Sequence, residues 1–314
     1  MPTGRFAPSP SGPLHVGNLR TAVLAWLFAR HEGSRFLVRI DDLDRAASRP
    51  EHERSQLAHL AALGIESDGE VVRQSERFPL YEAQLDRLGA EGLLYPCYCT
   101  RREVQEAARA PHGSQAEGTY PGTCRDLTPT QRRDRAAVRR PAWRVRAEGA
   151  HVVVEDRRHG SFEATVDDFV VRRADGTPAY QLAVVVDDDA QGVGEVVRGD
   201  DLLATTPRQV WLAQTLGTKV PCYSHVPLVL GPDGQRLAKR HGAVTLDDLQ
   251  AAGVDPPRLL GMLAASLGLR PPGARVASVG DLLADFSPEA VPRRPWVLPA
   301  DRIGKVGDVR VRAM

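Results

Sequence analysis

The chain is nearly neutral and has the composition of a folded protein. Its 314 residues include 41 lysines and arginines against 40 acidic residues, and 42% of them are apolar. This composition excludes a disordered chain and predicts either two ordinary domains of about 150 residues or one large α/β unit. The longest apolar run near the start, Ala22 to Ala29, is far below the roughly 18 residues of a membrane span. Because the N-terminus has no signal-peptide pattern, we expect a cytoplasmic protein without a membrane partner.

The first part of the chain has the pattern of a β–α–β unit. A short strand is expected at Arg5 to Ala7, before a stretch rich in proline, serine and glycine that excludes regular structure. A helix should follow Gly17, with Asn18 as its N-cap, and end at Gly33. Arg35 to Ile40 predicts a second strand. This order begins a doubly wound, mostly parallel α/β sheet of the nucleotide-binding kind.

Helices and a β-rich middle are predicted further along the chain. Helices are expected at Glu51 to Leu63, Leu80 to Glu91 and Pro207 to Leu216, and an exposed loop at Ala107 to Gly118. Strands are predicted at Val152 to Glu155, Phe162 to Thr165, Phe169 to Arg172, Leu182 to Val186 and Val226 to Leu230. The remaining C-terminal residues have a helical pattern punctuated by prolines.

The turn that opens the first helix is a candidate phosphate site. It contains His15, Gly17 and Asn18. A helix N-terminus offers free N–H groups to phosphate, a neutral imidazole can donate to it, and a glycine lets a nucleotide approach the backbone. A solvated turn histidine is the alternative. No Walker A sequence is present, which disfavours a P-loop ATPase.

A second candidate segment follows a Gly-Pro-Asp-Gly turn and contains Lys239. The chain has only three lysines among its 41 basic residues, so a lysine here goes against a strong arginine bias. A lysine on a loop suits the stabilisation of charge that develops on phosphate in a transition state. The alternative is a solvated basic loop.

Three of the four cysteines lie close together in the sequence. Cys97, Cys99 and Cys124 fall within 28 positions, around a turn-rich loop. In a reducing compartment this spacing favours a structural metal site over a disulfide, and the spacing alone would nominate His112 as the fourth ligand. Three buried thiols without a metal are the alternative.

Five segments, taken together and in order, resemble the glutamate-specific class I aminoacyl-tRNA synthetases. The stretch from Pro8 to Asn18 is similar to the "HIGH" signature of that family, and Arg236 to Arg240 is similar to its "KMSKS" signature. Between them, the resemblance extends to Arg39 to Asp44, Ala179 to Asp188 and Val197 to Gln209. It implies a Rossmann-like doubly wound sheet with a zinc-binding insertion and a C-terminal helical region similar to a stem-contact region.

The resemblance also implies a division of the chain. Residues 1–95 and 141–230 would be the two halves of the catalytic domain, 96–140 the zinc-binding insertion, and 231–314 the signature loop and helical region. After Ala243 only 71 residues follow, too few for the helical domain with which a glutamyl synthetase reads the anticodon. We therefore expect no anticodon-binding domain.

A chain of this length resembles the glutamyl-queuosine tRNA(Asp) synthetases, which are stand-alone catalytic paralogues. The resemblance implies a monomeric ligase that activates L-glutamate with ATP and esterifies it to queuosine in the anticodon of tRNA(Asp). Two alternatives remain open. One is a minimal glutamyl-tRNA synthetase that charges a 3′ end, and the other is a non-catalytic paralogue that binds tRNA or an amino acid, for which Asp41 and Ala238 are the hints.

The family's glutamate-binding positions are carried over one by one. Arg5 and Arg198 would each pair with a carboxylate of glutamate through two hydrogen bonds. Tyr180 would hydrogen-bond the ligand from the lip of a strand, and Ala7 and Ser9 would complete the glutamate site. Surface arginines and a half-buried tyrosine are the ordinary alternatives.

Asp41 departs from the family pattern. It would hold the α-ammonium of glutamate from the carboxyl end of the second strand, where the family usually has glutamate in R-I-E-D. The shorter side chain loses about one carbon–carbon bond of reach, which Asp42 or a bridging water could restore.

The implied reaction is an in-line attack of glutamate on the α-phosphorus of ATP. His15, Gly17 and Asn18 would bind ATP, and Lys239 would stabilise the leaving pyrophosphate, whose oxygens Mg²⁺ would bridge. His15, Gly17 and Lys239 are thus the expected catalytic positions. No Ser-His-Asp or Cys-His signature indicates a covalent nucleophile.

The family pattern also bears on the metal. It places a tyrosine four residues before the last cysteine, so the resemblance points to one structural Zn²⁺ held by Cys97, Cys99, Tyr120 and Cys124, with Tyr120 preferred to His112. The arginine-rich stretch from Arg125 to Arg146 follows this site and could contact a tRNA backbone. An equally good interpretation is that this stretch forms a solvent-exposed face without a partner.

Overall fold

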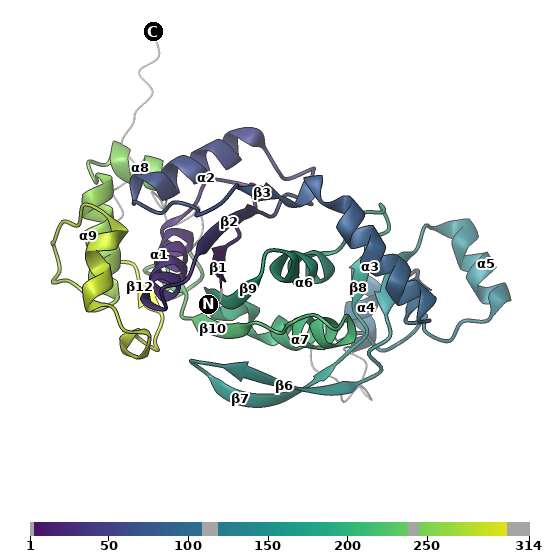
Figure 1. The fold of residues 1–314 in the computed structure, drawn as a ribbon. Coiled ribbons are helices and arrows are strands. Elements are labelled where there is room, and N and C mark those ends of the chain that lie inside the picture. Colours follow the sequence, from purple (N-terminus) through teal and green to yellow (C-terminus); the bar gives the residue numbers. More distant parts are fainter. Residues whose placement is uncertain (1–2, 109–118, 238–244, 300–314) are drawn as a thin grey trace, which may run out of the picture.

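A computed structural model of the chain describes residues 3–108, 119–237 and 245–299 (Figure 1). The large sheet contains β1 (Thr3–Phe6), β2 (Phe36–Ile40), β3 (Val72–Arg73), β6 (Ala150–Asp156), β7 (Gly160–Val166), β9 (Val193–Gly199) and β10 (Cys222–Val226). A three-stranded sheet contains β4 (Leu94–Cys97), β5 (Ala142–Val145) and β8 (Val170–Arg172), and β11 (Val229–Leu230) pairs with β12 (Trp296–Val297).

Helices pack against the strands and make up most of the C-terminal part of the described chain. They are α1 (Val16–His31), α2 (Pro50–Ala62), α3 (Phe78–Ala90), α4 (Arg101–Ala108), α5 (Pro129–Val138), α6 (Tyr180–Ala190), α7 (Thr206–Thr215), α8 (Leu246–Ala251) and α9 (Pro256–Ser266). Short 3₁₀ helices are η1 (Gln74–Glu76), η2 (Asp200–Thr205), η4 (Val279–Asp285) and η5 (Pro288–Ala290). None of the helices in these described parts combines the length and apolar composition that crossing a bilayer requires.

The large sheet is doubly wound. Its strand order is β3-β2-β1-β9-β10-β6-β7, and all neighbours are parallel except β6 and β7. The first half of the chain builds outward from β1 and the second half outward from β9, so the winding reverses between these two strands. In such sheets a ligand binds beyond the carboxyl ends of the strands at this reversal. The predicted doubly wound α/β class is confirmed.

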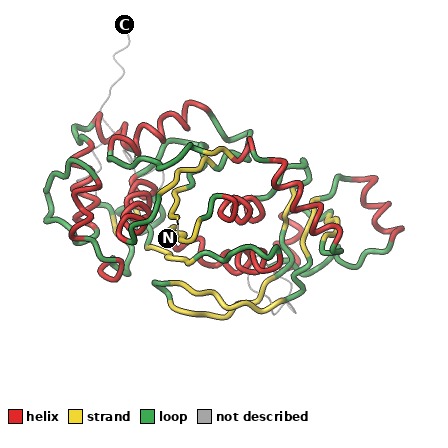
Figure 2. Tube along the Cα trace, viewed as in Figure 1, coloured by secondary structure: helices red, strands yellow, loops and turns green. Residues whose placement is uncertain are grey.

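Two separate cores cover the two faces of the sheet. One contains the buried side chains of α1 together with those of α8, α9 and η4, and the other contains α3, α6 and α7. Helix α1 lies close against β1, because a Cβ at Gly4 would come within 2.7 Å of the Cβ of Ala29. Figure 2 shows helices on both sides of the strands. These two layers hold the carboxyl ends of β1 and β9 in place.

The predicted strand at Leu182 to Val186 is wrong, because this run is the middle of helix α6. The run is apolar throughout since α6 is buried between α3, α7 and β9, and a short apolar run does not distinguish a buried helix from a buried strand. The strand that belongs here is β9, which begins three residues after the helix ends.

Two further boundaries differ from the prediction. The N-cap of α1 is His15, and Asn18 is the third helical residue. The strand expected from Val226 to Leu230 is divided, because β10 ends at Val226 and β11 begins at Val229. Most of the predicted loop from Ala107 to Gly118 lies outside the described residues.

Candidate active site

A cavity of about 670 Å³ lies at the carboxyl ends of β1 and β9. It brings together every described residue that the sequence nominated for glutamate or ATP: Arg5, Ala7, Ser9, His15, Gly17, Asn18, Asp41, Tyr180 and Arg198. Arg236 and Leu237 of the second signature also line it, whereas Lys239 lies outside the described residues. The segments that resemble the family blocks therefore meet at one place, which is where a doubly wound sheet binds its ligand.

His15 is held by a reciprocal capping box at the start of α1. Its Nδ1 accepts a hydrogen bond from the N–H of Asn18 at 3.2 Å, and the Asn18 side-chain oxygen accepts from the N–H of His15 at 3.2 Å. Burial lowers the pKa of His15, and the nearby positive charge of Arg236 lowers it further. His15 is therefore neutral at pH 7, and because Nδ1 is an acceptor its proton is on Nε2, as a donor.

Gly17 gives the imidazole of His15 its space. A Cβ at position 17 would lie 2.8 Å from Cε1 and 3.0 Å from Nδ1 of His15. Any larger residue would displace the ring from the capping box. Gly17 thus has a packing reason to be glycine in addition to the nucleotide approach that the sequence suggested.

Gln56 of α2 holds the signature loop, and the sequence did not indicate it. Its amide donates to the carbonyl of Ser9 at 2.9 Å and to that of Gly12 at 2.6 Å, and the side chain is buried. A proline-rich loop lacks the N–H groups to form its own ladder, so a side chain from another element fixes its shape.

Arg5 and Asp41 belong to a buried network of charged side chains that lies next to the cavity. Arg39 of β2 donates from Nε to Asp41 at 2.8 Å and from Nη1 to Asp188 of α6 at 2.7 Å. Arg5 contacts the same Asp188 through Nε and Nη2, each at 3.4 Å. Burial would raise the pKa of Asp188, but Arg5 and Arg39 outweigh it and hold that pKa below its ordinary value. The guanidinium of Arg5 is therefore positioned before any ligand binds.

Asp41 has a different electrostatic environment. Burial raises the pKa of its carboxyl to about 6, against the opposing attraction of Arg39 and Arg5. The attraction of Arg39 and Arg5 only partly offsets the cost of burying the carboxylate. A positively charged ligand group would therefore stabilise the ionised form further. This fits the role of binding an ammonium, which the sequence assigned to it.

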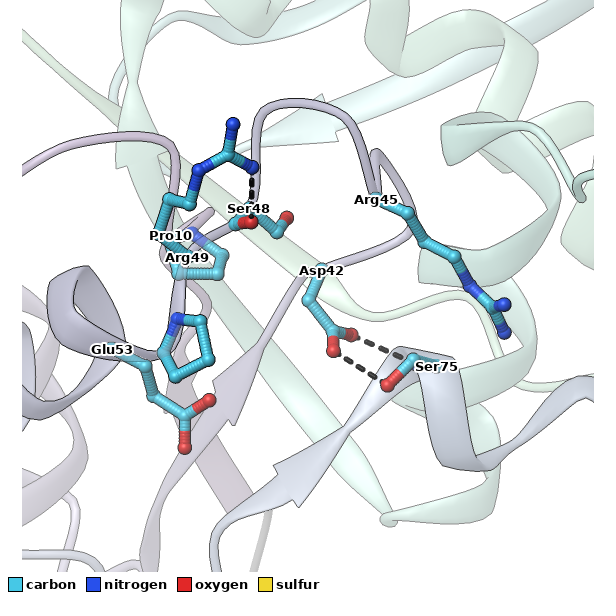
Figure 3. Close-up of a pocket in the computed structure, with 8 residues that line it drawn as sticks. Pro10, Asp42, Arg45, Ser48, Arg49, Glu53 and Ser75 are labelled. Carbon is cyan, nitrogen blue, oxygen red and sulfur yellow. Dashed lines mark hydrogen bonds between the residues drawn. The ribbon is translucent and has the colours of Figure 1, made fainter.

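Asp42 does not share this cavity. Its carboxylate accepts hydrogen bonds from the Ser75 N–H at 2.8 Å and the Ser75 hydroxyl at 2.5 Å. It lines a second cavity of about 300 Å³ together with Pro10, and Figure 3 shows the Asp42 and Ser75 pair there. The expectation that Asp42 could replace the missing reach of Asp41 is wrong, because both of its oxygens are directed to Ser75.

Arg198 is the second-to-last residue of strand β9, and one nitrogen of its guanidinium has no partner in the described part of the chain. Nε donates to Nε2 of His225 at 3.0 Å and Nη2 donates to the Thr206 hydroxyl at 2.9 Å. Nη1 is buried and has no hydrogen-bond partner among the described residues. Because an unpaired buried guanidinium nitrogen is costly, a ligand carboxylate in the cavity is a suitable partner.

Tyr180 and Arg236 reach the cavity from positions that the sequence did not specify. Tyr180 is the first residue of α6, so it lines the cavity from a helix N-terminus, and the predicted position at the lip of a strand is wrong. The residue is 39% exposed and lines the cavity, so a ligand there can contact it. Arg236 forms an ion pair with Asp201 of η2 at 2.5 Å, which ties the second signature to the end of β9.

Sequence reasoning missed several residues of this site. Arg39, Gln56, Asp156, Asp188, Thr206 and His225 support the cavity residues from behind. A usable signal existed for Arg39, because an arginine within the apolar strand FLVRI requires buried carboxylate partners. No comparable local signal marks His225, since its partner Asp156 is 69 residues away in sequence.

The three neighbouring cysteines form a cluster that could hold a metal ion. The sulfur atoms of Cys97, Cys99 and Cys124 lie within 4.8 Å of one another, and Cys99 and Cys124 are 3.6 Å apart. Four ligands around a tetrahedral zinc with usual bond lengths would place two sulfurs about 3.8 Å apart and a sulfur and an oxygen about 3.5 Å apart. The hydroxyl of Tyr120 is 3.4 Å from the Cys97 sulfur, so this distance and the one between Cys99 and Cys124 are both close to those values. His112 lies outside the described residues.

Much of the arginine-rich stretch supports this cluster. Arg125 pairs with Asp168 at 2.7 Å, Arg139 donates to the Tyr98 carbonyl at 2.9 Å, and Arg144 lies 3.7 Å over the ring of Tyr120. Helix α5 contacts the cluster through Arg135, which donates to the Cys124 sulfur at 3.6 Å, but no residue of α5 is buried, and α5 stands at the end of the molecule (Figures 1 and 2). The stretch therefore combines a structural part with an exposed basic helix.

Comparisons with known proteins agree with this geometry. Residues 3–279 match the family model of the catalytic domain of class I tRNA synthetases (E and Q). The glutamyl-Q tRNA(Asp) synthetase of Nocardia farcinica is 59% identical, over 94% of this chain and 92% of that protein. The one from Symbiobacterium thermophilum is 49% identical, over 96% and 98%. The solved glutamate-tRNA synthetase of Elizabethkingia anophelis superimposes with a TM-score of 0.81 at 25% identity, covering 96% of this chain and 68% of that one.

The fold, the cavity and the relatives thus lead to one assignment. The family model covers most of the chain, and the two relatives are matched over nearly their whole length. The chain is a ligase that belongs to the class I tRNA synthetases and, within them, to the glutamyl-Q tRNA(Asp) synthetase family.

Proposed function

We propose that this ligase activates L-glutamate with ATP and transfers it to queuosine in the anticodon of tRNA(Asp). The observation that carries the glutamate assignment is the unpaired, buried Nη1 of Arg198 in a cavity that also contains Arg5. The guanidinium groups of Arg5 and Arg198 suit the two carboxylates of such a ligand, and Asp41 suits its ammonium. Tyr180, Ala7 and Ser9 complete the wall that faces this ligand.

The chemistry of activation needs positioning and neutralisation of charge. A glutamate carboxylate attacks the α-phosphorus of ATP, and pyrophosphate leaves. Neutral His15 donates from Nε2 to a phosphate oxygen at the N-terminus of α1, and Asn18 and Gly17 keep the ring in that position. Lys239 neutralises the leaving pyrophosphate. Mg²⁺ bound to ATP supplies charge neutralisation on the phosphate oxygens.

The transfer step is supported by the relatives. The chain matches proteins named glutamyl-Q tRNA(Asp) synthetase over more than nine-tenths of their length, but it covers 68% of a glutamate-tRNA synthetase. A minimal glutamyl-tRNA synthetase is the second candidate, because the fold is shared with that enzyme. Acylation of tRNA(Asp) with and without queuosine separates the two.

We further propose one structural zinc, bound by Cys97, Cys99, Cys124 and Tyr120. Zinc would stabilise a module whose buried cluster is small, while the exposed arginines of α5 contact the RNA backbone. Metal analysis of Tyr120→Phe and His112→Ala tests the ligands, with Cys222→Ser as the matched control. Zinc loss in His112→Ala alone would reverse the assignment of Tyr120.

The activation half is tested by exchange of labelled pyrophosphate into ATP. The purified chain, with glutamate and without tRNA, should catalyse this exchange, because the cavity contains the side chains proposed to bind glutamate. Aspartate and glutamine at equal concentration serve as controls, since neither has both the length and the second carboxylate. Absence of glutamate-dependent exchange would contradict the proposal.

A further inference from the structure

We propose that His225 and Asp156 are positioning residues that hold the guanidinium of Arg198 in the orientation that receives a carboxylate. The inference rests on the proposed function, in which Arg198 binds glutamate. Neither residue lines the cavity, and both are buried. Their effect on the substrate must therefore pass through Arg198.

The sheet places the three side chains in a row. Arg198 on β9 and His225 on β10 are directly paired in the parallel register, and Asp156 is the last residue of the next strand, β6. Asp156 is 2.6 Å from Nδ1 of His225, and Nε2 on the far side of the ring is 3.0 Å from Nε of Arg198. A chain of hydrogen bonds thus crosses three strands and ends at the cavity.

The direction of these bonds selects one form of His225. Arg198 can only donate, so Nε2 of His225 must be an acceptor without a proton. The remaining proton is on Nδ1, where the carboxylate of Asp156 accepts it. Asp156 is itself fixed, because it also accepts from the main-chain N–H groups of Arg158 at 2.8 Å and His159 at 2.9 Å. Asp156 thereby determines the tautomer, and the tautomer determines where Arg198 can donate.

A second acceptor completes the orientation of the guanidinium. The Thr206 hydroxyl accepts from Nη2 of Arg198 at 2.9 Å, and the guanidinium lies 5.2 Å from the centre of the Tyr223 ring. With Nε and Nη2 both occupied on the protein side, Nη1 is the nitrogen left for a ligand. The pair of acceptors, His225 and Thr206, thus sets which edge of the guanidinium is available.

Protonation of His225 would disrupt this arrangement, because two N–H donors and two positive charges would then face each other. The charged or titratable groups that face His225 are Asp156, His159, Arg198, Tyr223 and Asp200. Burial lowers the pKa of His225 and Arg198 lowers it further, although Asp156 opposes them, so the neutral form agrees with the geometry.

Asp156→Asn is the most informative substitution. The amide oxygen of asparagine would take the two main-chain N–H groups of Arg158 and His159, which leaves its NH₂ group facing both Nδ1 and the main-chain N–H of His225. The histidine would then move its proton to Nε2 and oppose Arg198. In pyrophosphate exchange we expect the KM for glutamate to rise about tenfold or more, with kcat and the KM for ATP within about twofold of wild type.

A matched pair of variants separates positioning from packing. His225→Gln keeps an acceptor that can reach Arg198 and should retain most of the affinity for glutamate, whereas His225→Leu fills similar space without an acceptor and should resemble Asp156→Asn. His159→Gln is the control, because His159 is a neighbouring histidine, 6.4 Å from His225 between ring centres, and it has no contact with Arg198 in the described residues. Thermal unfolding of each variant shows which ones are folded.

The outcomes distinguish this inference from the proposed function. If the wild type shows no glutamate-dependent exchange, the proposed function and this inference are both contradicted. If the wild type exchanges and folded Asp156→Asn and His225→Leu have a wild-type KM for glutamate, the inference alone is overturned. Because a variant could unfold, ¹⁵N chemical shifts of histidine in the wild-type chain provide a direct test. They should show the proton of His225 on Nδ1, and a proton on Nε2 would overturn the inference.

Discussion

The cavity at the carboxyl ends of β1 and β9 and the module around Cys97, Cys99 and Cys124 are stabilised in different ways. The buried apolar residues that line the cavity belong to one of the two large cores, and Arg5 and Arg198 already have carboxylate or imidazole partners. The module has one small buried cluster, and its helix α5 buries no residue. The difference separates a preorganised site for small substrates from a module that suits a metal and a large, charged partner.

This comparison predicts that the cavity and the module serve different steps of the reaction. Substitutions in the cavity should affect the activation of glutamate, whether or not RNA is present. Substitutions on the module should leave activation intact and affect only transfer to tRNA. A result that crosses this division would contradict the comparison.

The largest effect is expected for Lys239→Ala. Loss of a cation that neutralises pyrophosphate in the transition state should lower kcat of exchange by about 10²–10³-fold. The measurement is glutamate-dependent pyrophosphate exchange without tRNA. Lys219→Ala is the matched control, because Lys219 is exposed and lies outside the cavity. Equal activity of the two variants would remove Lys239 from the mechanism.

A pH effect of about tenfold is expected from Asp41. Because its pKa is raised to about 6, the carboxylate that would bind ammonium is ionised at pH 7 and becomes protonated as the pH falls through 6. The KM for glutamate should therefore rise about tenfold between pH 7 and pH 5. In Asp41→Asn the KM should be high throughout and this dependence should disappear. A dependence that persists in the variant would assign it to another group.

A smaller effect is expected for Gly17→Ala. The added Cβ would lie 2.8 Å from Cε1 of His15, so the imidazole must leave its preferred position. Displacement of that size costs on the order of 1 kcal/mol, so the KM for ATP should rise about three- to tenfold. Gly89→Ala in α3 is the control, because a Cβ there meets nothing closer than 4.0 Å. An unchanged KM for ATP would show that His15 does not contact ATP.

The smallest effect is expected on α5 and tests the other side of the comparison. Reversing two exposed charges, Arg133→Glu in α5 together with Arg140→Glu two residues after the helix ends, should slow transfer to tRNA several-fold and leave exchange unchanged. The dependence of tRNA affinity on salt should also weaken by about one unit of slope for each lost phosphate contact. Arg54→Glu with Arg258→Glu is the matched control for net charge. Equal effects of both pairs of substitutions would indicate that the net charge of the protein, and not a local contact of α5, determines the rate of transfer to tRNA.

The sequence predicted those parts of the molecule in which local pattern and structure agree. The β1–α1–β2 unit has helical periodicity bounded by glycines, and the cysteines are close in sequence, so both were found. The sequence pattern predicts a strand where helix α6 lies, because burial on several sides removes the polar positions that reveal a helical period. Tyr180 was consequently placed on the wrong element although it reaches the expected cavity.

Contacts between residues that are far apart in the sequence could not be predicted from local sequence patterns. Asp156 and His225 are joined only because β6 lies beside β10 in the sheet. Gln56 reaches the signature loop across 47 positions to Ser9. Strand order, and not any local pattern, determines these contacts.

Transfer of labelled glutamate to tRNA(Asp) with and without queuosine tests the central claim most directly. The tRNA is then cleaved with a nuclease, and the label is located in the anticodon fragment or at the 3′ end. We predict label only on the tRNA that contains queuosine and only in its anticodon fragment. Label at the 3′ end, or equal labelling of tRNA(Asp) without queuosine, would contradict the proposed function and favour a minimal glutamyl-tRNA synthetase.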